Sequence, residues 1–360
     1  MRPYNVEIFT PDFTLVGNTN VNTISYKEDY ISSDDNSITV FPVAGVEKQD
    51  YIRICRGKEE YAGIVTEITY GTDQSKQLQV ITFKPLMELL NTGFLFDVNK
   101  QGQGTLEQFM ADAIKQMFID NTDEKQNITG LQIEVTSGTP DWGFHITPAD
   151  SGGHYNIVNL MDSVIIPALQ KYSVLVRCRL DVQKKQLIVS IGKAEDKTVI
   201  IESDLPNIIK KNVVIKKFST DVNKLILYNT ASDYTESVTY YLHTGLGYDT
   251  KDRDRILPVA CAIKAVTTDE STSFISAAQR EAANQFANKS FSNLIELTMS
   301  SDDALVNPKE MEFGQLVTII SDGVSYQSIL TGKEVGSNTK LIFGTIRLDL
   351  TKILRRNSNG

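Results

Sequence analysis

Residues 50–90 read DYIRICRGKEEYAGIVTEITYGTDQSKQLQVITFKPLMELL, and this stretch decides how the fold is interpreted. Short runs rich in β-branched and aromatic residues alternate with polar, glycine-bearing turns; in order, these runs and turns cover residues 51–55, 56–58, 61–68, 71–73 and 78–83. Strands this close in sequence pair as an antiparallel meander, because parallel pairing needs a longer crossover. The stretch therefore predicts part of a small β-barrel or sandwich, followed by one or two helical turns over 86–90 behind Pro85.

Residues 314–354, GQLVTIISDGVSYQSILTGKEVGSNTKLIFGTIRLDLTKIL, repeat this order near the other end of the chain. In both stretches a strand and a turn lead to a strand that begins with tyrosine and ends with threonine, at 61–66 and 326–331. A long loop, another strand and a short apolar segment follow each time. Such self-similarity is typical of a duplicated unit. Two unrelated three-stranded meanders would also look alike, so both interpretations stay open, with duplication favoured.

The charge and cysteine content exclude several classes of protein. The chain has 360 residues, with 36 basic against 45 acidic side chains and a formal charge of -9. Non-specific nucleic-acid binding draws its affinity from lysine and arginine at phosphates, so we do not expect it here. Cys55, Cys178 and Cys261 are far apart and odd in number, which fits neither a disulfide framework nor a CxxC motif. The length suggests two or three domains.

The hydropathy pattern predicts neither a signal peptide nor a membrane span. Residues 1–13 include Glu7 and Asp12 and lack the apolar centre of about seven to fifteen residues that a signal peptide needs. No window approaches the roughly eighteen uninterrupted apolar residues that cross a bilayer. We therefore expect a soluble protein with no stable membrane insertion.

The segment 95–203 has a mixed α+β pattern. Thr105 and Gln108 have the spacing of a capping box before a run of apolar residues that recur every three or four positions. A second amphipathic stretch contains Pro167, which predicts a kink unless the helix restarts there. The expected elements are helices over 105–119 and 157–172 and a hairpin of strands 173–180 and 187–191. We interpret the segment as an inserted or second domain.

Strands return after residue 204. The expected elements are strands over 213–216, 224–228 and 236–242, a helix at about 271–289, and three or four closing strands. The predicted fold class is therefore α+β and mainly β. The predicted domains are an N-terminal barrel over 1–94, an α+β domain over 95–203, a second barrel with the helix over 204–354, and a disordered tail over 355–360.

No complete catalytic or cofactor motif is present. The chain contains no GxxxxGK[ST], HExxH or GxSxG pattern. Gly102 and Gly104 begin a dinucleotide fingerprint, but Glu107 stands at its third glycine position, which favours a flexible helix entry. Three histidines in the whole chain leave few candidates for acid–base chemistry. We predict no catalytic, cofactor-binding or metal-binding residue, no cofactor and no enzymatic activity; an unrecognised carboxylate pair is the weakest alternative.

Two clusters resemble metal sites in part. They are His145, Asp150 and His154, and Asp249, Asp252 and Asp254. The first has irregular spacing around two glycines, which favours a solvated loop. The second is interleaved with basic residues and lacks the glycine and glutamate of a calcium loop, which favours a salt-bridged turn.

Two further features concern contacts with other molecules. Trp142 lies in a loop rich in glycine and proline, where it anchors the loop or forms an oligomer contact more often than it stacks on a ligand. Five lysines form a local basic patch that could meet an acidic neighbouring subunit, although a solvated strand face is the default; they are Lys210, Lys211, Lys216, Lys217 and Lys224.

The pattern of both ends resembles a known family. The start over 4–13, the strand pair 51–54 and 61–66, and the later repeat resemble the baseplate hub or tail-associated proteins of tailed bacteriophages, prophages and phage-tail-like bacteriocins. The resemblance covers most of the chain and rests on strand patterns without a signature residue. It implies two barrels similar to the tail-tube protein in each subunit, and three subunits in a ring of six barrels decorated by smaller α+β domains.

The resemblance implies a structural role. We expect a homotrimeric, pseudo-hexameric hub that adapts the tail tube to the tip, with tail-tube or distal tail rings on one side and tip or fibre components on the other. DNA would only pass through the lumen, and the protein would assemble in the host bacterial cytoplasm and reside in the virion. The chain ends after the second barrel pattern, so we expect no lytic role. The alternative is a carbohydrate- or cell-surface-binding β-protein with Trp142 as the sugar platform.

Overall fold

The computed structural model of the chain describes most of its length. The described residues are 2–30, 35–73, 76–97, 102–143, 155–193, 199–202, 204–215, 222–232, 235–243, 248–254, 259–268, 273–286, 293–300 and 306–344. They form a mainly β structure with two curled sheets and few helices, so the predicted fold class is confirmed. The expected disordered tail over 355–360 lies outside the described residues. In the described part, no helix is long and apolar enough to span a membrane.

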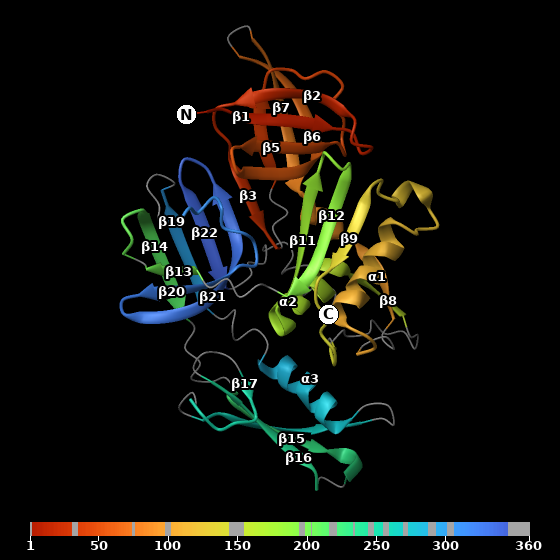
Figure 1. Cartoon of the computed structure of the whole chain (residues 1–360), viewed down its shortest axis with the longest axis vertical. Helices are drawn as coiled ribbons and strands as arrows, with labels where there is room; N and C mark the ends of the chain where they lie inside the picture. Colours follow the sequence, from red (N-terminus) through yellow and green to blue (C-terminus); the bar gives the residue numbers. More distant parts are fainter. Residues whose placement is uncertain are drawn as a thin grey trace.

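The N-terminal sheet has six antiparallel strands in the order β2-β1-β5-β6-β7-β4. Its strands are β1 (Tyr4–Phe9), β2 (Leu15–Val21), β4 (Asn36–Val40), β5 (Tyr51–Arg56), β6 (Glu59–Asp73) and β7 (Lys76–Pro85), and the short 3₁₀ helix η1 (Leu86–Leu90) follows. Alternate residues such as Val6, Ile8, Ile52 and Ile54 face inward and form one core. The sheet stands at the top of Figure 1.

The C-terminal sheet has the main order β13-β20-β21-β22-β19-β14. Its strands are β13 (Val199–Glu202), β14 (Ile208–Ile215), β19 (Asn293–Met299), β20 (Leu316–Ser321), β21 (Val324–Val335) and β22 (Thr339–Gly344). β13 runs parallel to β20, and the other neighbours are antiparallel. The sheet encloses its own core around Ile295, Leu297, Ile319 and Phe343.

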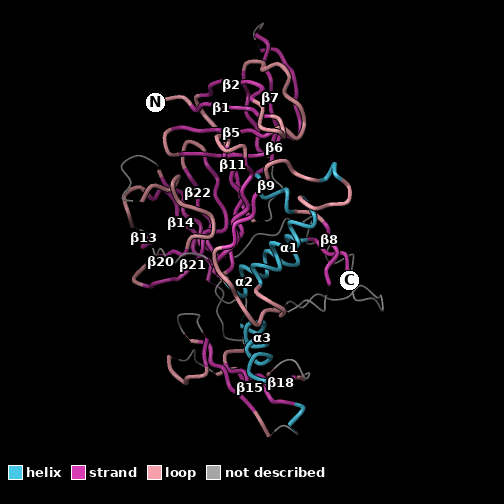
Figure 2. The backbone as a smooth tube through the Cα atoms, turned by 45° about the vertical axis from the view of Figure 1, so that its right-hand side comes forward, coloured by secondary structure: helices cyan, strands magenta, loops and turns pink. Residues whose placement is uncertain are grey.

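A third body contains five strands and two α-helices. It comprises β8 (Gly93–Asp97), α1 (Leu106–Phe118), the 3₁₀ turn η3 (Glu124–Gln126), β9 (Leu131–Val135), β10 (Tyr155–Asn159), the π-helical turn η4 (Met161–Ile165), α2 (Ile166–Tyr172), β11 (Val174–Asp181) and β12 (Gln186–Lys193). Thr105 caps α1 by accepting a hydrogen bond from the Gln108 backbone, which confirms the predicted helix start. Gln108 itself donates its side-chain amide to Asp112 rather than reaching back. Figure 2 shows α1 and α2 beside the strands of this body.

The second predicted helix is shorter than the pattern indicated. Residues 155–159 form β10, which pairs with β8, and the helical part begins only near Met161. Pro167 lies at the first turn of α2, directly after a π-helical turn. Because proline donates no backbone hydrogen bond, it suits the first turn of a helix, and the start of α2 at Ile166 agrees with the predicted restart.

A small domain lies between β14 and β19 in sequence. It consists of β15 (Lys224–Asn229), the 3₁₀ turn η5 (Thr230–Ser232), β16 (Ser237–Leu242), β17 (Tyr248–Asp249), β18 (Cys261–Val266) and α3 (Phe274–Phe286). The helix expected at about 271–289 is therefore present, and it packs on this separate four-stranded sheet with its own core. Thus the range 204–354, predicted as one barrel, contributes to two sheets. The domain stands at the bottom of Figure 1.

The two meanders that led the sequence analysis have the same strand register. Each pair of residues across β5 and β6 recurs across β20 and β21, 265 positions later. The corresponding pairs are Tyr51 with Ile64 and Leu316 with Ile329, Ile52 with Gly63 and Val317 with Ser328, and Ile54 with Tyr61 and Ile319 with Tyr326. Two unrelated meanders would not need to share a register, so the agreement supports a duplicated unit.

The irregular features of the two meanders also coincide. β6 has a bulge at Thr66 and β21 has one at Thr331, and each threonine hydroxyl donates to a carbonyl on the next strand, at 3.2 Å and 3.3 Å. Gln49 and Gly314, at the entries of the meanders, have φ angles of 75° and 74°. Bulges and left-handed residues are local departures that alternating hydrophobicity does not impose. Their coincidence therefore favours duplication over chance resemblance.

Candidate functional site

A short strand from the N-terminal half pairs with the edge of the C-terminal sheet and joins the two sheets. β3 (Tyr26–Asp29) follows the N-terminal strand β2 in sequence but pairs antiparallel with β21 of the C-terminal sheet. The pairs join Tyr26 to Val335 and Asp29 to Gly332 at the two ends of the ladder. Figure 1 shows β3 running from the upper sheet to the edge of the blue one. We call this ladder the β3–β21 junction.

Apolar side chains make the β3–β21 junction part of the N-terminal core. The Tyr26 ring lies 4.8 Å from the Tyr61 ring and 6.3 Å from the Phe83 ring, between centroids. Val335 belongs to the C-terminal sheet, yet it is 3 % exposed and packs in this same N-terminal core. The two barrels therefore share buried surface, which costs free energy to expose.

Asn36 fixes the start of β3. Its side-chain oxygen accepts a hydrogen bond from the Lys27 backbone N–H at 2.6 Å, and its amide donates to the Lys27 carbonyl at 3.0 Å. Asn36 is 3 % exposed. A buried amide that matches both backbone groups of one residue imitates a strand partner, so it holds β3 in an extended conformation that points away from its own sheet.

A buried lysine lies at the centre of the β3–β21 junction. The Lys333 amine donates to the carbonyls of Lys309 and Met311, at 2.5 Å and 3.1 Å, and lies 5.9 Å from the centre of the Tyr61 ring. Burial lowers the pKa of Lys333 to about 8, opposed by the attraction of acidic neighbours, with Glu28 the strongest. Burial likewise raises the pKa of Glu28, and the positive charge of Lys333 opposes that shift. Charge and hydrogen bonding thus tie the loop before β20 to the N-terminal half.

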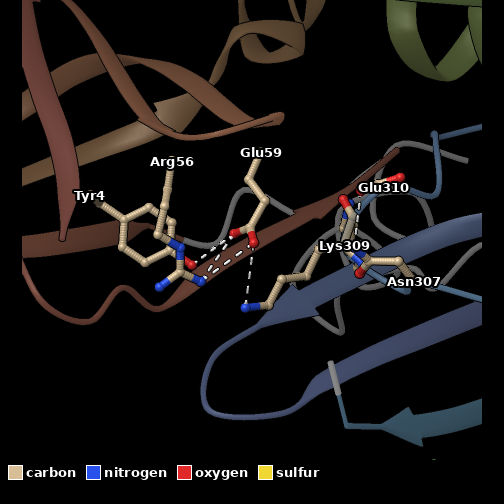
Figure 3. A network of polar contacts seen from close by, with 7 residues as sticks. Tyr4, Arg56, Glu59, Asn307, Lys309 and Glu310 are labelled. Atoms are coloured by element: carbon tan, nitrogen blue, oxygen red, sulfur yellow. Dashed lines mark hydrogen bonds and ion pairs between the residues drawn. The ribbon is translucent and has the colours of Figure 1, made fainter. Parts of the chain in front are cut away.

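A second polar contact extends this connection, as Figure 3 shows. Glu59 accepts a hydrogen bond from the Tyr4 hydroxyl at 2.9 Å and lies 3.4 Å from the Arg56 guanidinium and 3.8 Å from the Lys309 amine. Arg56 also stacks over the Tyr4 ring, 3.9 Å from its centre. Burial, followed by the bond to Glu59, raises the pKa of Tyr4. In the same loop, the side-chain oxygen of Asn307 accepts a hydrogen bond from the Lys309 backbone N–H, and its amide donates one to the Glu310 carboxylate.

The third body meets the same loop from its other side. Arg177 of β11 forms an ion pair with Glu312 at 2.7 Å and donates to the Phe313 carbonyl at 3.1 Å. The Tyr30 ring lies 5.0 Å from the Phe313 ring. Residues 307–313 are therefore held by the N-terminal sheet and by β11 at once.

Two grooves of about 460 and 580 Å³ lie between these bodies: the N-terminal half and the third body line the first, and the C-terminal half also contributes to the second. Glu28, Glu60, Tyr61, Cys178 and Arg179 line both of them. Burial raises the pKa of the Cys178 thiol to about 12, so this sulfur is protonated at neutral pH and a poor nucleophile. Arg53, which lines the first groove, is engaged by both Glu7 and Glu60 at 2.9 Å. The charged side chains of the grooves are largely occupied in connecting strands to one another.

The sequence-derived metal candidates are not assembled into a site that can be described. His145, Asp150 and His154 lie outside the described residues. Asp249 instead lies 3.0 Å from the His243 ring and 2.8 Å from the Arg253 guanidinium, and it accepts from the Lys251 backbone. This agrees with a salt-bridged turn. Across the ranges that the structure describes, no three His, Cys, Asp or Glu residues are grouped to hold a metal ion.

The remaining candidates have structural surroundings. Trp142 is fully buried against Phe109, with ring centres 4.5 Å apart, so its ring offers no face to a sugar. Gly102 and Gly104 have positive φ angles of 72° and 63° ahead of the Thr105 cap, as expected of a helix entry. Of the five lysines in the basic patch, Lys211 pairs with Asp322 at 3.2 Å and Lys224 lies over the Tyr241 ring. Lys216 and Lys217 lie outside the described residues.

Sequence reasoning missed the β3–β21 junction altogether. Residues 26–29 form a strand of four residues, too short to show a period, and Lys333 stands beside Glu334 in a strand whose pattern does not mark it as buried. The register of the repeat was the one available signal, because it reveals that β21 continues past its pairing with β20.

Comparison with known proteins identifies the fold. No protein-family model and no curated protein sequence matches the chain. Among solved structures it is similar to the 43 kDa tail protein of prophage MuSo2 from Shewanella oneidensis, at 12 % identity and a TM-score of 0.50, over 96 % of this chain and 98 % of that one. A tail protein from Neisseria meningitidis is similar at 11 % identity and a TM-score of 0.50, over 95 % and 97 % of the two chains. At these identities the likeness concerns the fold, and at that level the resemblance to phage tail proteins is confirmed.

Proposed function

We propose that this chain is a structural component of the tail tip or baseplate of a phage, prophage or phage-tail-like particle, and that it forms a trimeric, pseudo-hexameric hub ring. The observation that carries the proposal is the β3–β21 junction, which connects two duplicated barrel sheets within one chain. The fold shared with prophage tail proteins over nearly the whole length supports the same role.

The duplication explains why a trimer suits this role. A homotrimer matches a sixfold tube only if each chain presents two equivalent units. Here the two units share strand register, bulge and entry turn, so they can occupy equivalent places in a ring. The β3–β21 junction would then be the first of the contacts between neighbouring barrels, already formed inside the chain.

The partners and surroundings follow from that geometry. One face of the ring would bind tail-tube or distal tail rings, and the other would bind tip or fibre components. The formal charge of -9 per chain would keep a lumen from holding DNA that passes through it. In this proposal the protein is not an enzyme, assembles in the host bacterial cytoplasm and resides in the virion.

Light scattering after size-exclusion chromatography tests the proposal. We expect a species of three times the 40.1 kDa of the chain, and rings in electron micrographs. A particle that stays monomeric at every concentration, with no ring in the micrographs, would contradict it.

A further inference from the structure

The N-terminal sheet contains an open counterpart of the edge that β3 fills. In the C-terminal sheet, β21 pairs with β20 through residues 324–329 and then, on the same side, with β3 through 332–335. In the N-terminal sheet, β6 pairs with β5 through residues 59–64 and extends to Asp73. In the described part of the chain, no strand pairs with that side of β6 beyond Ile64. Residues 67–70 of β6 correspond to 332–335 of β21 in the repeat.

This open edge is a formed strand rather than a loop. β6 stays paired with β7 on its other side from Glu67 to Asp73, so its backbone is extended throughout. Its outer side therefore presents a row of N–H and C=O groups in strand geometry. Such an edge is a template for pairing with another chain unless charge, proline or a covering segment blocks it.

The side chains at the two corresponding edges differ in burial. Val335 is 3 % exposed because Tyr26 of β3 and the N-terminal core cover it. Tyr70 occupies the corresponding position in β6 and is 65 % exposed. Its hydroxyl accepts a hydrogen bond from Gln79, which leaves much of the ring facing solvent. Large aromatic side chains are enriched at protein–protein interfaces, so an exposed one beside an unpaired strand edge is typical of a contact residue.

We propose that residues 67–73 of β6 accept a strand from the C-terminal half of a second copy of this chain, as β21 accepts β3 within one copy. The inference rests on the proposed ring. In a ring of alternating N-terminal and C-terminal barrels, the acceptor edge of each barrel faces the barrel beside it. The C-terminal acceptor is filled from within the chain, so the N-terminal acceptor is left for the C-terminal half of the neighbour.

This contact is heterologous, because the donor and acceptor surfaces are different. Heterologous contacts close into a ring when their rotation divides the circle, and they need no twofold axis. Main-chain hydrogen bonds would supply a sequence-independent part of the affinity, as in other cases of strand addition. Tyr70 would enter the apolar core of the neighbouring barrel as Val335 enters the N-terminal core here.

Two measurements test this edge. The first is the oligomeric state of Tyr70→Glu, a charge placed on the edge, against Ile263→Glu, an equally exposed position at 65 % in the small inserted domain. We expect the trimer of the first variant to dissociate at concentrations at least tenfold higher than that of the wild type, and the second to behave as the wild type. Circular dichroism of both variants checks that they are folded.

The second measurement is amide hydrogen exchange of the wild-type protein over residues 66–73. Exchange should be at least tenfold slower in the trimer than in dilute monomer. A wild-type trimer in which Tyr70→Glu has no effect and these amides exchange freely would overturn the inference while leaving the proposed ring intact. A wild type that never associates would overturn both.

Discussion

At the scale of residues, Gln49 and Gly314 show how duplicated turns diverge. Both hold a left-handed backbone, with φ angles of 75° and 74°, where the chain enters a meander. Gln49 bears its side chain there at a cost, since left-handed conformations are unfavourable for residues with a Cβ. At Gly314 a Cβ would in addition lie 2.3 Å from a methyl carbon of Leu175. The C-terminal meander therefore requires glycine at position 314, whereas the N-terminal meander tolerates a side chain at position 49.

Substitutions at these two positions should have opposite effects. We expect Gly314→Ala to lower the free energy of unfolding by about 1–3 kcal/mol, from backbone strain and the clash with Leu175. Gln49→Gly should leave stability unchanged or raise it by up to about 1 kcal/mol. Urea denaturation of the two variants measures both changes. Equal effects at the two positions would contradict the argument.

Lys333 gives the β3–β21 junction a defined dependence on pH. Its pKa is about 8 in the folded protein, against an unperturbed value of 10.5. Between these values the unfolded chain binds more protons than the folded one, so the contribution of Lys333 makes the free energy of unfolding rise with pH. The cost of the buried charge is fully present below about pH 8 and is lost towards pH 10.5. Burial lowers the pKa of the amine; the nearby carboxylates of Glu28, Glu59 and Glu312 oppose that shift, and the charge of Lys309 adds to it.

The comparison of wild type with Lys333→Met isolates this contribution. From pH 7 to pH 10.5 we expect the stability of the wild type to gain on the order of 3 kcal/mol relative to that variant. Lys211→Met, a change at a lysine whose side chain is 40 % exposed, serves as the control and should show no comparable gain. Parallel pH profiles for wild type and Lys333→Met, measured by chemical denaturation, would rule out this account of the lysine.

At the scale of elements, the paired bulges of β6 and β21 are stabilised by the same threonine contact. Thr331 is 2 % exposed, whereas Thr66 is half-buried. Thr331→Val removes the hydroxyl bond to Ile342 in a buried place and should cost about 1 kcal/mol. Thr66→Val should cost less, because water can reach the carbonyl that is left. Thermal unfolding measures both costs, and the exposed Thr69→Val should change stability by no more than about 0.5 kcal/mol. A larger loss at Thr66 than at Thr331 would contradict this explanation.

Elements with a clear period were predictable, and short ones were not. The alternation in 51–55 and 61–68 predicted β5 and β6, and the apolar face of 105–119 predicted α1, because burial of one face imposes these periods. Residues 157–172 carry a helical pattern, yet the first of them form β10 because β8 lies beside them. β3 has four residues, and its partner β21 lies some three hundred positions away, so no local pattern could reveal it.

At the scale of the whole molecule, the small domain is an insertion into the C-terminal barrel. Ile215 at the end of β14 pairs with Asn293 at the start of β19, so the ends of the insertion are adjacent. Its core around Leu225, Leu227 and Phe286 is separate from that of the barrel. A hydrogen bond from Lys171 of α2 to Asn284 of α3, at 2.7 Å, connects the small domain with the third body.

Removal of this insertion should therefore leave the barrels folded. We expect a chain in which an Asn-Gly turn replaces residues 216–292 to retain a cooperative unfolding transition, because that turn closes an antiparallel hairpin of two strands. Calorimetry of the shortened chain, with circular dichroism of its strands, measures the outcome. Loss of the transition would show that the insertion is needed to fold the C-terminal sheet.

The sequence by itself determined the mainly β class, the two meanders, the capped helix α1 and the absence of the common catalytic motifs. These follow from local periodicity, from turn residues and from which residue types are present. Only the tertiary structure decided that β3 of the N-terminal half pairs with the C-terminal sheet, that Lys333 is buried, that the small domain has a sheet of its own, and that Trp142 is enclosed. Each of these depends on contacts between residues far apart in the chain. Burial and main-chain pairing at such contacts leave no periodic pattern in the sequence that could be read locally.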